Sequence, residues 1–337
     1  MFDMEYKHML YDKRWCSNHG IGRFATELLQ FERRPAISGP FSDIFKFYDP
    51  IKLYLLCKKR GSWFVSPSYN APVLWSKKSI ITVHDLMHIN YSEYAGLKNR
   101  LYYDFIVKPV CKNSPLVFTV SEFTKQEIVN WAGIKESKVV VVYNGVDDKY
   151  HVDVMPHQAS RPYIFYIGDK KPHKNLKRLI EAFSLSSAAK THHLMLSGVE
   201  NHQIKEWSLE FGVEDKIMFA GFIPEEELPS YYKGAALLAL PSLYEGFGLP
   251  IIEAMAVGTP VLTSNLTSMP EIADNAALLV NPYNTAEIAT GIDKLVTDNS
   301  LRESLIEKGL VRASFFNWDK SREIWNDSLS KIIGNGQ

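Results

Sequence analysis

The sequence has few cysteines and no long apolar stretch. Cys16, Cys57 and Cys111 are the only cysteines among 337 residues, and their spacing fits neither a metal site nor a redox motif. We expect them to be structural thiols. Apolar runs such as residues 235–240 fall far short of the roughly 20 residues that a membrane-spanning helix needs. The first ten residues carry three charged side chains and so lack the apolar segment of a signal peptide. We therefore expect a cytoplasmic protein.

Net charge is also absent, because 38 Lys and Arg balance 38 Asp and Glu. The halves differ, since residues 1–150 hold 21 Lys and Arg against 15 Asp and Glu. This mild excess favours a first half that lies near an anionic surface, and no nucleic-acid partner is indicated. A hydrophobic fraction of 46% and a charged fraction of 23% are typical of a soluble globular protein.

Short apolar runs alternate with longer segments of helical spacing, which predicts an α/β protein with parallel sheets covered on both faces. The predicted strands are residues 80–83, 116–120, 139–142, 163–167, 193–196, 217–220, 237–240, 260–262 and 277–280. The predicted helices are residues 97–108, 122–131, 176–188, 226–234 and 249–257.

The length predicts two domains of about 150 residues each. Residues 148–162 interrupt the alternation, because they combine prolines and histidines with little periodicity. We therefore expect a first domain over 1–150, a linker over 151–162 and a second domain over 163–315. Residues 316–337 should contain a terminal helix packed on a domain surface.

A glycine-rich segment, Gly20-Ile21-Gly22-Arg23-Phe24-Ala25, shares letters with the dinucleotide-binding fingerprint. That fingerprint needs a hydrophobic strand directly before the glycines, and residues 14–19 do not form one. The segment instead predicts a tight loop opening a helix over 23–30, where backbone N–H groups meet an anion or a hydroxyl. A simple helix-capping loop is the alternative.

His84-Asp85 directly follows the predicted strand 80–83. The pair should lie at the carboxyl end of a parallel strand, where open α/β sheets bind ligands. A histidine and an aspartate that satisfy each other in a loop are an equally good interpretation.

Three lysines gather where the strand ending at 167 passes into a helix: Lys170, Lys171 and Lys174. Lysines at a helix N-terminus oppose the helix dipole unless an anion offsets them, and a phosphate is the natural anion. A solvated basic loop explains Lys170 and Lys171 equally well. It explains Lys174 less well, because that residue stands at the helix start.

The most informative segment runs from Pro241 to Ala254. Gly246 and Gly248 follow a predicted strand and allow the backbone to approach a ligand, and a helix then begins near Pro250. Two carboxylates, Glu245 and Glu253, stand with seven residues between them. A helix-cap glutamate with a surface glutamate would explain the carboxylates but not the glycines.

The block from Glu245 to Glu253, with 240–242 before it and 256–261 after it, resembles the signature of the retaining GT-B glycosyltransferases, family 4. That family includes sucrose synthases and bacterial mannosyltransferases. Other matching segments are residues 20–24, 84–85, 120–122, 143–146, 174–176 and 270–272. The resemblance covers most of the chain. It implies two Rossmann-like domains facing a central cleft, with the C-terminal helix returning toward the first.

The resemblance also assigns roles. It implies that Lys174 holds the donor diphosphate, that Glu245 binds the transferred sugar and that His84 contacts this sugar, which makes these three the candidate catalytic residues. Glu253 would hold the ribose. The donor-binding set is Gly22, Lys170, Lys171, Lys174, Phe222, Ile223, Glu245, Gly246, Phe247, Gly248, Leu249 and Glu253, and the acceptor-side set is Gly20, Gly22, Arg23 and Asp85.

One position departs from the family pattern. Many members have arginine after the glycine at 168, whereas this chain has Asp169, so Lys170 or Lys171 is expected to supply the missing charge. The chain contains no Asp-x-Asp triplet, and we expect neither a metal ion nor another cofactor.

The resemblance favours a hexosyltransferase that uses a nucleotide sugar, with GDP-mannose as the preferred candidate, and a saccharide or lipid-linked acceptor in bacterial lipopolysaccharide or other surface polysaccharide synthesis. The alternatives are a GT-B sugar-nucleotide epimerase and a non-catalytic partner subunit. Residues 53–56 beside Lys58-Lys59-Arg60 and Trp63-Phe64 predict peripheral contact with the inner face of the membrane, or else a buried helix with a solvated end.

Overall fold

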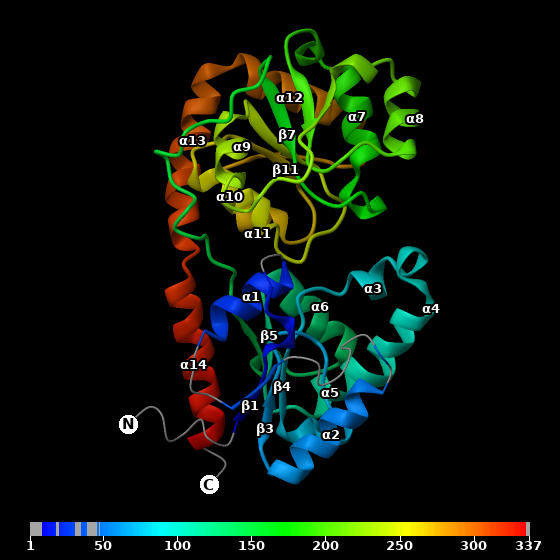
Figure 1. The fold of residues 1–337 in the computed structure, drawn as a ribbon, viewed down its shortest axis with the longest axis vertical. Helices are drawn as coiled ribbons and strands as arrows, with labels where there is room; N and C mark the ends of the chain where they lie inside the picture. The colour runs from blue at the N-terminus through cyan, green and yellow to red at the C-terminus, as the bar shows by residue number, and fades with distance from the viewer. Residues whose placement is uncertain (1–8, 18–19, 31–34, 39–45, 47, 335–337) are drawn as a thin grey trace. The chain divides into compact units, whose positions relative to one another are not determined.

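The chain divides into two compact units. The computed structural model describes residues 9–17, 20–30, 35–38, 46 and 48–334. Unit 1 comprises Met1–Gly145 and Trp318–Gln337, and unit 2 comprises Val146–Asn317. Figure 1 shows both units and labels many of their helices and strands.

Unit 1 is built on a six-stranded parallel sheet in the order β2-β1-β3-β4-β5-β6. β-Branched and aromatic residues are frequent in these short strands, and both faces of the central ones are buried, as in parallel sheets generally. The strands are β1 (Met9–Asp12), β2 (Ala36–Ile37), β3 (Trp63–Val65), β4 (Ser79–Thr82), β5 (Val117–Thr119) and β6 (Val139–Val141).

Helices cover this sheet. α6 shows how the sequence delimits one of them: Ser121 Oγ accepts a hydrogen bond from Thr124 N–H at 3.1 Å, and Gly133 ends the helix with φ 64°. The helices of unit 1 are α1 (Ile21–Leu28), α2 (Asp49–Arg60), α3 (Met87–Asn90), α4 (Ser92–Tyr102), α5 (Lys108–Asn113), α6 (Glu122–Ala132) and α14 (Trp318–Gly334), with the shorter turns η2 (Lys13–Trp15), η3 (Val73–Lys78), η4 (Tyr103–Val107) and η5 (Glu136–Lys138).

The last helix, α14, belongs to unit 1, although all of unit 2 separates it in sequence from the rest of that unit. Its Trp325 is fully buried, stacks on Phe118 of β5 at a centroid distance of 4.1 Å and meets Phe24 of α1 edge-on at 6.0 Å. Figure 1 shows α14 beside α1. Burial of this aromatic cluster holds the terminal helix on the sheet.

Unit 2 contains a second six-stranded parallel sheet, in the order β12-β11-β10-β7-β8-β9. Its strands are β7 (Tyr163–Tyr166), β8 (His193–Leu196), β9 (Ile217–Phe219), β10 (Leu237–Leu240), β11 (Val261–Ser264) and β12 (Leu278–Val280). Its helices are α7 (Leu176–Leu185), α8 (His202–Glu210), α9 (Leu228–Gly234), α10 (Leu249–Ala256), α11 (Met269–Ala273), α12 (Thr285–Thr297) and α13 (Asn299–Phe315), with η6 (Pro172–Lys174), η7 (Ser187–Lys190) and η8 (Glu214–Lys216).

Both sheets reverse their strand order at one point. In unit 2, β7 is followed by β8 on one side and has β10 on the other. In unit 1, β1 is followed by β2 on one side and has β3 on the other. Such switch points leave a crevice at the carboxyl ends of the strands, where doubly wound sheets bind ligands.

The predicted α/β class and the nine predicted strands are confirmed, but the expected linker is not a separate segment. The backbone N–H of His157 donates to the carbonyl of Ser230 at 2.9 Å, and the His157 ring stacks on Tyr231 at 3.9 Å. These contacts place residues 151–162 in unit 2, whose first residue is Val146. A polar composition with little periodicity does not reveal such packing.

Candidate functional site

The loop from β10 to α10 presents backbone groups at a helix start. Gly248 precedes α10 and has φ 97°, a left-handed conformation that favours glycine. A Cβ at this position would also meet Ile251 Cδ1 at 3.0 Å. The first N–H groups of α10 therefore follow a turn that only glycine fits without strain, and such a helix end attracts anions.

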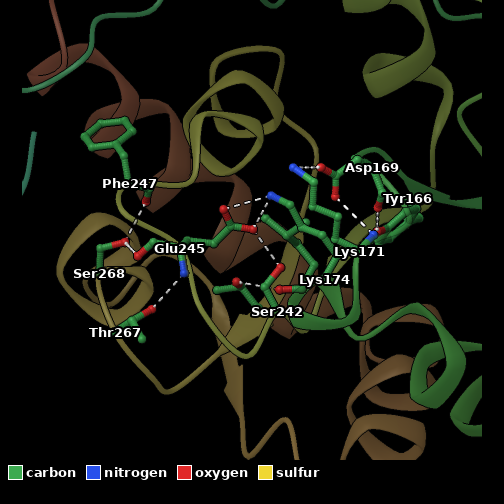
Figure 2. A network of polar contacts seen from close by, with 12 residues as sticks. Tyr166, Asp169, Lys171, Lys174, Ser242, Glu245, Phe247, Thr267 and Ser268 are labelled. Carbon is green, nitrogen blue, oxygen red and sulfur yellow. Dashed lines mark hydrogen bonds and ion pairs between the residues drawn. The ribbon is translucent and has the colours of Figure 1, made fainter. Parts of the chain in front are cut away.

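Lys174 and Glu245 meet at the switch point of unit 2. Lys174 ends η6, which follows β7, and Glu245 follows the neighbouring strand β10. Lys174 Nζ lies 2.8 Å from Glu245 Oε1 and 2.9 Å from Oε2, and the side chains are 18% and 12% exposed. Ser242 Oγ donates to Glu245 Oε1 at 2.7 Å (Figure 2). A cation and a carboxylate thus share one partly buried site.

The two loops that carry these charges are bonded to each other. Asn175, with φ 60°, donates its amide hydrogens to the carbonyls of Pro241 at 2.9 Å and Pro282 at 2.7 Å. The backbone N–H of Leu243 donates to the carbonyl of His173 at 2.7 Å. Asn175 therefore fixes the backbone next to Lys174, a structural role that the sequence analysis did not assign.

Lys170 and Lys171 have other partners than Lys174 has. Lys170 Nζ donates to the carbonyl of Val199, and Lys171 Nζ lies 2.9 Å from Asp169 Oδ2. Burial raises the pKa of the Asp169 carboxyl, but the bonds with Lys171 outweigh it, so the pKa lies below its ordinary value. The positive charge of Lys171 is therefore balanced by the residue that departs from the family pattern.

The remaining donor-side candidates differ in exposure. Glu253 is buried and accepts a hydrogen bond from the Tyr232 hydroxyl at 2.8 Å. Phe247 is also buried, and its ring meets Phe316 edge-on at 5.6 Å, so the residue offers its backbone rather than its ring. Gly246, Leu249 and Ile223 are half-buried, whereas Phe222 is 82% exposed on the loop after β9.

The glycine loop of unit 1 opens α1 as the sequence predicted. Gly20 stands before the helix with φ 50°. A Cβ on Gly22 would come within 1.7 Å of Ser17 Oγ, so only glycine fits there. Arg23 is 8% exposed at the start of the helix. The loop is thus tightly packed against residues that precede it.

His84 is a neutral, buried histidine at the carboxyl end of β4. Its Nε2 lies 2.7 Å from the carbonyl of Pro67, and its ring meets Phe24 edge-on at 4.8 Å. Burial lowers the pKa of His84 and outweighs the opposing effects of Pro67 and Asp85. Since a carbonyl only accepts, Nε2 carries the proton, and Nδ1 is left as an acceptor. Asp85 Oδ1 accepts a hydrogen bond from the N–H of Met87 at 2.9 Å.

A charged cluster that the sequence analysis missed lies at the switch point of unit 1. Arg14 donates to Asp12 Oδ1 and Oδ2 at 2.7 Å each, and to Asp49 Oδ1 at 2.6 Å. Asp12 and Asp49 are fully buried, and the Arg14 side chain is 4% exposed. Burial raises the pKa of Asp12 despite Arg14. The cluster joins the end of β1 to the start of α2.

Comparisons with known proteins identify the family. The model described as Glycosyl transferases group 1 matches residues 151–312, and Glycosyltransferase Family 4 matches residues 60–150. The chain is 31% identical over 327 residues to the O-antigen chain mannosyltransferase B of Escherichia coli, which covers 90% of this chain and 81% of that protein. The chain belongs to glycosyltransferase family 4. It is therefore a transferase.

A second relative is longer than this glycosyltransferase. The serotype-specific mannosyltransferase WbdA of Escherichia coli is 25% identical over 350 residues, which cover 96% of this chain and 40% of WbdA. The chain thus spans less than half the length of that relative.

Solved structures show the same fold for the glycosyltransferase. Sucrose-phosphate synthase from Thermosynechococcus elongatus has a TM-score of 0.75 at 19% identity and covers 97% of this chain and 99% of that chain. Anabaena HepE in complex with UDP has a TM-score of 0.77 at 16% identity, with coverage of 96% and 99%. These similarities, with the two parallel sheets, confirm the GT-B class.

Two further findings concern the described part of the glycosyltransferase. Within it, no group of three or more His, Cys, Asp or Glu side chains is placed to hold a metal ion. No helix in that part is both long enough and apolar enough to span a bilayer.

Proposed function

We propose that this glycosyltransferase moves a mannosyl residue from a nucleoside diphosphate sugar, with GDP-mannose as the first candidate, to a saccharide or lipid-linked saccharide acceptor in the synthesis of a bacterial surface polysaccharide. Three relatives are named mannosyltransferases, which supports the sugar: mannosyltransferase B and WbdA of Escherichia coli, and RfbU of Salmonella typhimurium. The first and the third are named O-antigen chain mannosyltransferases, which supports the pathway.

The pairing of Lys174 with Glu245 is the observation that carries the proposal. A diphosphate at the start of α10 would take Lys174 as its counter-ion, because phosphate and carboxylate compete for the same ammonium. Glu245 would then be available to the hydroxyls of the transferred sugar. The two members of the ion pair thus bind different parts of the donor: Lys174 binds the diphosphate and Glu245 binds the sugar.

The transfer proceeds with retention and without a protein nucleophile. The bond between the anomeric carbon and the diphosphate oxygen breaks, and the acceptor oxygen forms its bond on the same face of the sugar. The acceptor's proton passes to the leaving diphosphate oxygen. Lys174 and the backbone N–H groups at α10 stabilise the charge that develops on the diphosphate, and Glu245 stabilises the positively charged sugar. No metal ion and no cofactor enters these steps.

Acceptor-dependent release of nucleoside diphosphate tests the proposal. GDP-mannose, UDP-glucose and other nucleotide sugars are first ranked by the thermal stabilisation that they confer on the protein. The best ligand is then incubated with and without a mannose-terminated oligosaccharide. Release that requires the acceptor supports the transferase. Epimerisation without acceptor would support the epimerase, and binding without any turnover would support a non-catalytic subunit.

The anomeric configuration of the product is decided separately. An α-linked mannoside formed from the α-configured donor, measured by the one-bond C–H coupling of the product, supports retention. A β-linked product would overturn it.

We also propose that unit 1 contacts the cytoplasmic face of a membrane. Leu53 and Phe64, which the sequence favoured for this contact, are buried. Leu55, which belongs to the predicted patch, is 59% exposed. Further exposed apolar side chains on α2 and η3 are Ile51 at 58% and Leu74 at 76%.

Lysines accompany these apolar residues. The two elements contact each other, since the rings of Tyr54 and Trp75 are 6.2 Å apart. Exposed lysines on the same elements are Lys52, Lys58, Lys59, Lys77 and Lys78. Apolar side chains flanked by cations suit an anionic lipid surface.

Sedimentation with vesicles tests this contact. The wild type should co-sediment with phosphatidylglycerol-containing vesicles at low salt, and Lys77→Glu/Lys78→Glu should not. Lys190→Glu/Lys205→Glu, which reverses two exposed lysines of unit 2, is the control and should bind like the wild type. Failure of the wild type to bind, or equal loss in both variants, would remove the membrane from the proposal.

A further inference from the structure

The loop that follows β11 holds the backbone of Glu245 from both sides. The Glu245 N–H donates to Thr267 Oγ1 at 3.2 Å, and Ser268 Oγ donates to the Glu245 carbonyl at 2.8 Å. Ser268 Oγ also lies 3.1 Å from the Phe247 carbonyl, so one hydroxyl spans the turn at Gly246. Figure 2 shows Lys174 at the carboxylate of Glu245, and Thr267 and Ser268 at its backbone.

Thr267 has an unusual backbone conformation. Its φ is 57°, in the left-handed region that a β-branched residue rarely adopts. Glycine or asparagine would take this conformation with less strain. Strained residues of this kind concentrate at functional sites, where the surrounding structure holds them. Here the strained residue is the one whose hydroxyl accepts from Glu245.

Within the described part of the chain, the carboxylate of Glu245 contacts Lys174 and Ser242. In the proposed function, the donor diphosphate competes for Lys174 and weakens the ion pair between Lys174 and Glu245. The carboxylate then needs another means of staying in place. The backbone contacts of Thr267 and Ser268 do not involve Lys174, and so they persist when the diphosphate binds.

We propose that Thr267 and Ser268 are positioning residues that keep Glu245 in place for the transferred sugar once Lys174 has turned to the diphosphate. This inference rests on the proposed function. Ser268 fixes the two carbonyls of the turn, and Thr267 fixes the N–H that precedes it. The bonds of both residues go to the backbone of Glu245 and Phe247, so their loss should affect the sugar more than the nucleotide.

Matched variants test this separation. Thr267→Ala and Ser268→Ala remove the hydroxyls, and Thr267→Ser keeps one while it drops the methyl group. Ser208→Ala is the control, because Ser208 is a buried serine of the same unit whose hydroxyl donates to the Lys205 carbonyl at 2.9 Å, as Ser268 does to Glu245. For each variant, calorimetry compares nucleoside diphosphate with intact nucleotide sugar, and steady-state assays give kcat and KM.

The inference predicts one pattern. Thr267→Ala and Ser268→Ala should each lower kcat about three- to tenfold, as expected for one hydrogen bond, and their combination should lower it more. Their affinity for nucleoside diphosphate should stay within about twofold of the wild type, so the preference for the nucleotide sugar over the diphosphate shrinks. Thr267→Ser and Ser208→Ala should retain wild-type kcat.

Thr267→Gly separates positioning from folding. Glycine relieves the left-handed strain, so its Tm should equal or exceed that of Thr267→Ala. Its kcat should nevertheless be as low as that of Thr267→Ala, because it also lacks the hydroxyl. A role in folding alone would make the more stable variant the more active one.

Several results would overturn the inference. These are wild-type kcat in both alanine variants, an impaired Thr267→Ser, or a loss of diphosphate affinity as large as the loss of turnover. A wild type that binds the nucleotide sugar but transfers to no acceptor would overturn the proposed function instead. The binding preference of the variants would then still decide this inference.

Discussion

Lys174 Nζ lies within 2.9 Å of both carboxylate oxygens of Glu245, so the two side chains neutralise each other in the absence of donor. Each side chain follows one of the two strands that meet at the switch point of unit 2, β7 and β10. Both are less than one-fifth exposed. Removing one of them therefore breaks a partly buried ion pair, and the consequence differs for phosphate binding and for sugar binding.

Replacing each partner in turn should separate phosphate binding from sugar binding. Lys174→Ala removes the counter-ion and leaves Glu245 to repel the diphosphate, so affinity for nucleoside diphosphate should fall about ten- to hundredfold, the equivalent of about 1.5–3 kcal/mol. Glu245→Gln removes the negative charge beside Lys174, so diphosphate affinity should match or exceed that of the wild type while kcat falls. Calorimetry and steady-state assays measure both.

Lys177→Ala is the matched control for this pair, because Lys177 lies three residues further along on α7 and pairs with Glu210 on the surface. It should bind and turn over like the wild type. Equal diphosphate affinity in Lys174→Ala and the wild type would remove the phosphate role from Lys174. Unimpaired turnover in Glu245→Gln would remove the carboxylate from the reaction.

Asp169 should weaken the binding of the diphosphate. It holds Lys171 in an ion pair of 2.9 Å and adds a negative charge to the loop that carries Lys174. Asp169→Asn removes the charge and keeps the shape, so diphosphate affinity should rise about two- to fivefold, the scale of an exposed ion pair. The rise should shrink at high salt.

Glu210→Gln is the control for Asp169→Asn, since its carboxylate also forms an exposed 2.9 Å pair with a lysine, Lys177. Its diphosphate affinity should not change. A lower affinity in Asp169→Asn would mean that the aspartate supports the loop more than it repels the ligand.

The sequence predicted the parts of the fold that rest on apolar runs. Strands from β4 to β12 are such runs, and each was predicted. β1, β2 and β3 were not predicted, because β2 has only two residues and polar residues directly follow the apolar residues of β1 and β3. The cluster of Asp12, Arg14 and Asp49 was missed with them, since it joins residues 35 positions apart. Asp12 and Arg14 directly after Met9–Tyr11 were the available signal.

The sequence pointed to the charged residues of the candidate site, Lys174 and Glu245, but not to the contact between them. A lysine after one strand and a glutamate after another point to one edge of a sheet, but only the strand order makes β7 and β10 neighbours. Thr267 and Ser268 were not predicted at all. Bonds from side chains to the backbone of another loop leave no period in the sequence.

Arg14 should be essential for the stability of unit 1. Arg14→Met would remove the cation that the buried carboxylates of Asp12 and Asp49 share, so the free energy of unfolding should fall by about 3–5 kcal/mol. Arg322 also pairs with two carboxylates, Glu27 and Asp319, but is 25% exposed, so Arg322→Met should cost less than about 1 kcal/mol. Urea unfolding measures both. Equal losses of unfolding free energy in the two variants would show that burial does not make the Arg14 cluster more stabilising than the exposed Arg322 pairs.

Transfer should continue in the presence of a chelator. Lys174 and the N–H groups at the start of α10 neutralise the diphosphate in the proposed reaction, so no divalent ion is required. The initial rate in excess EDTA should stay within about twofold of the untreated rate, and added magnesium should not raise it. Complete loss of activity, with recovery on adding magnesium or manganese, would contradict the proposed mechanism.

His84 should make the protein less stable in acid. Burial lowers the folded-state pKa of His84 below the ordinary value of 6.5. Between pH 6.5 and this lower pKa, His84 is therefore protonated in the unfolded chain but not in the folded chain. Stability is therefore highest above this range, and it falls as the pH drops from 6.5 toward the folded-state pKa. His84→Gln keeps an N–H donor for the Pro67 carbonyl and does not titrate.

The difference between the two proteins isolates this effect, because other histidines with lowered pKa, such as His173 and His193, remain in both. Urea unfolding at several values between pH 8 and pH 5 should show that the wild type loses more stability than His84→Gln, with a gap that grows as the pH falls. Parallel curves would mean that His84 takes up its proton in the folded state.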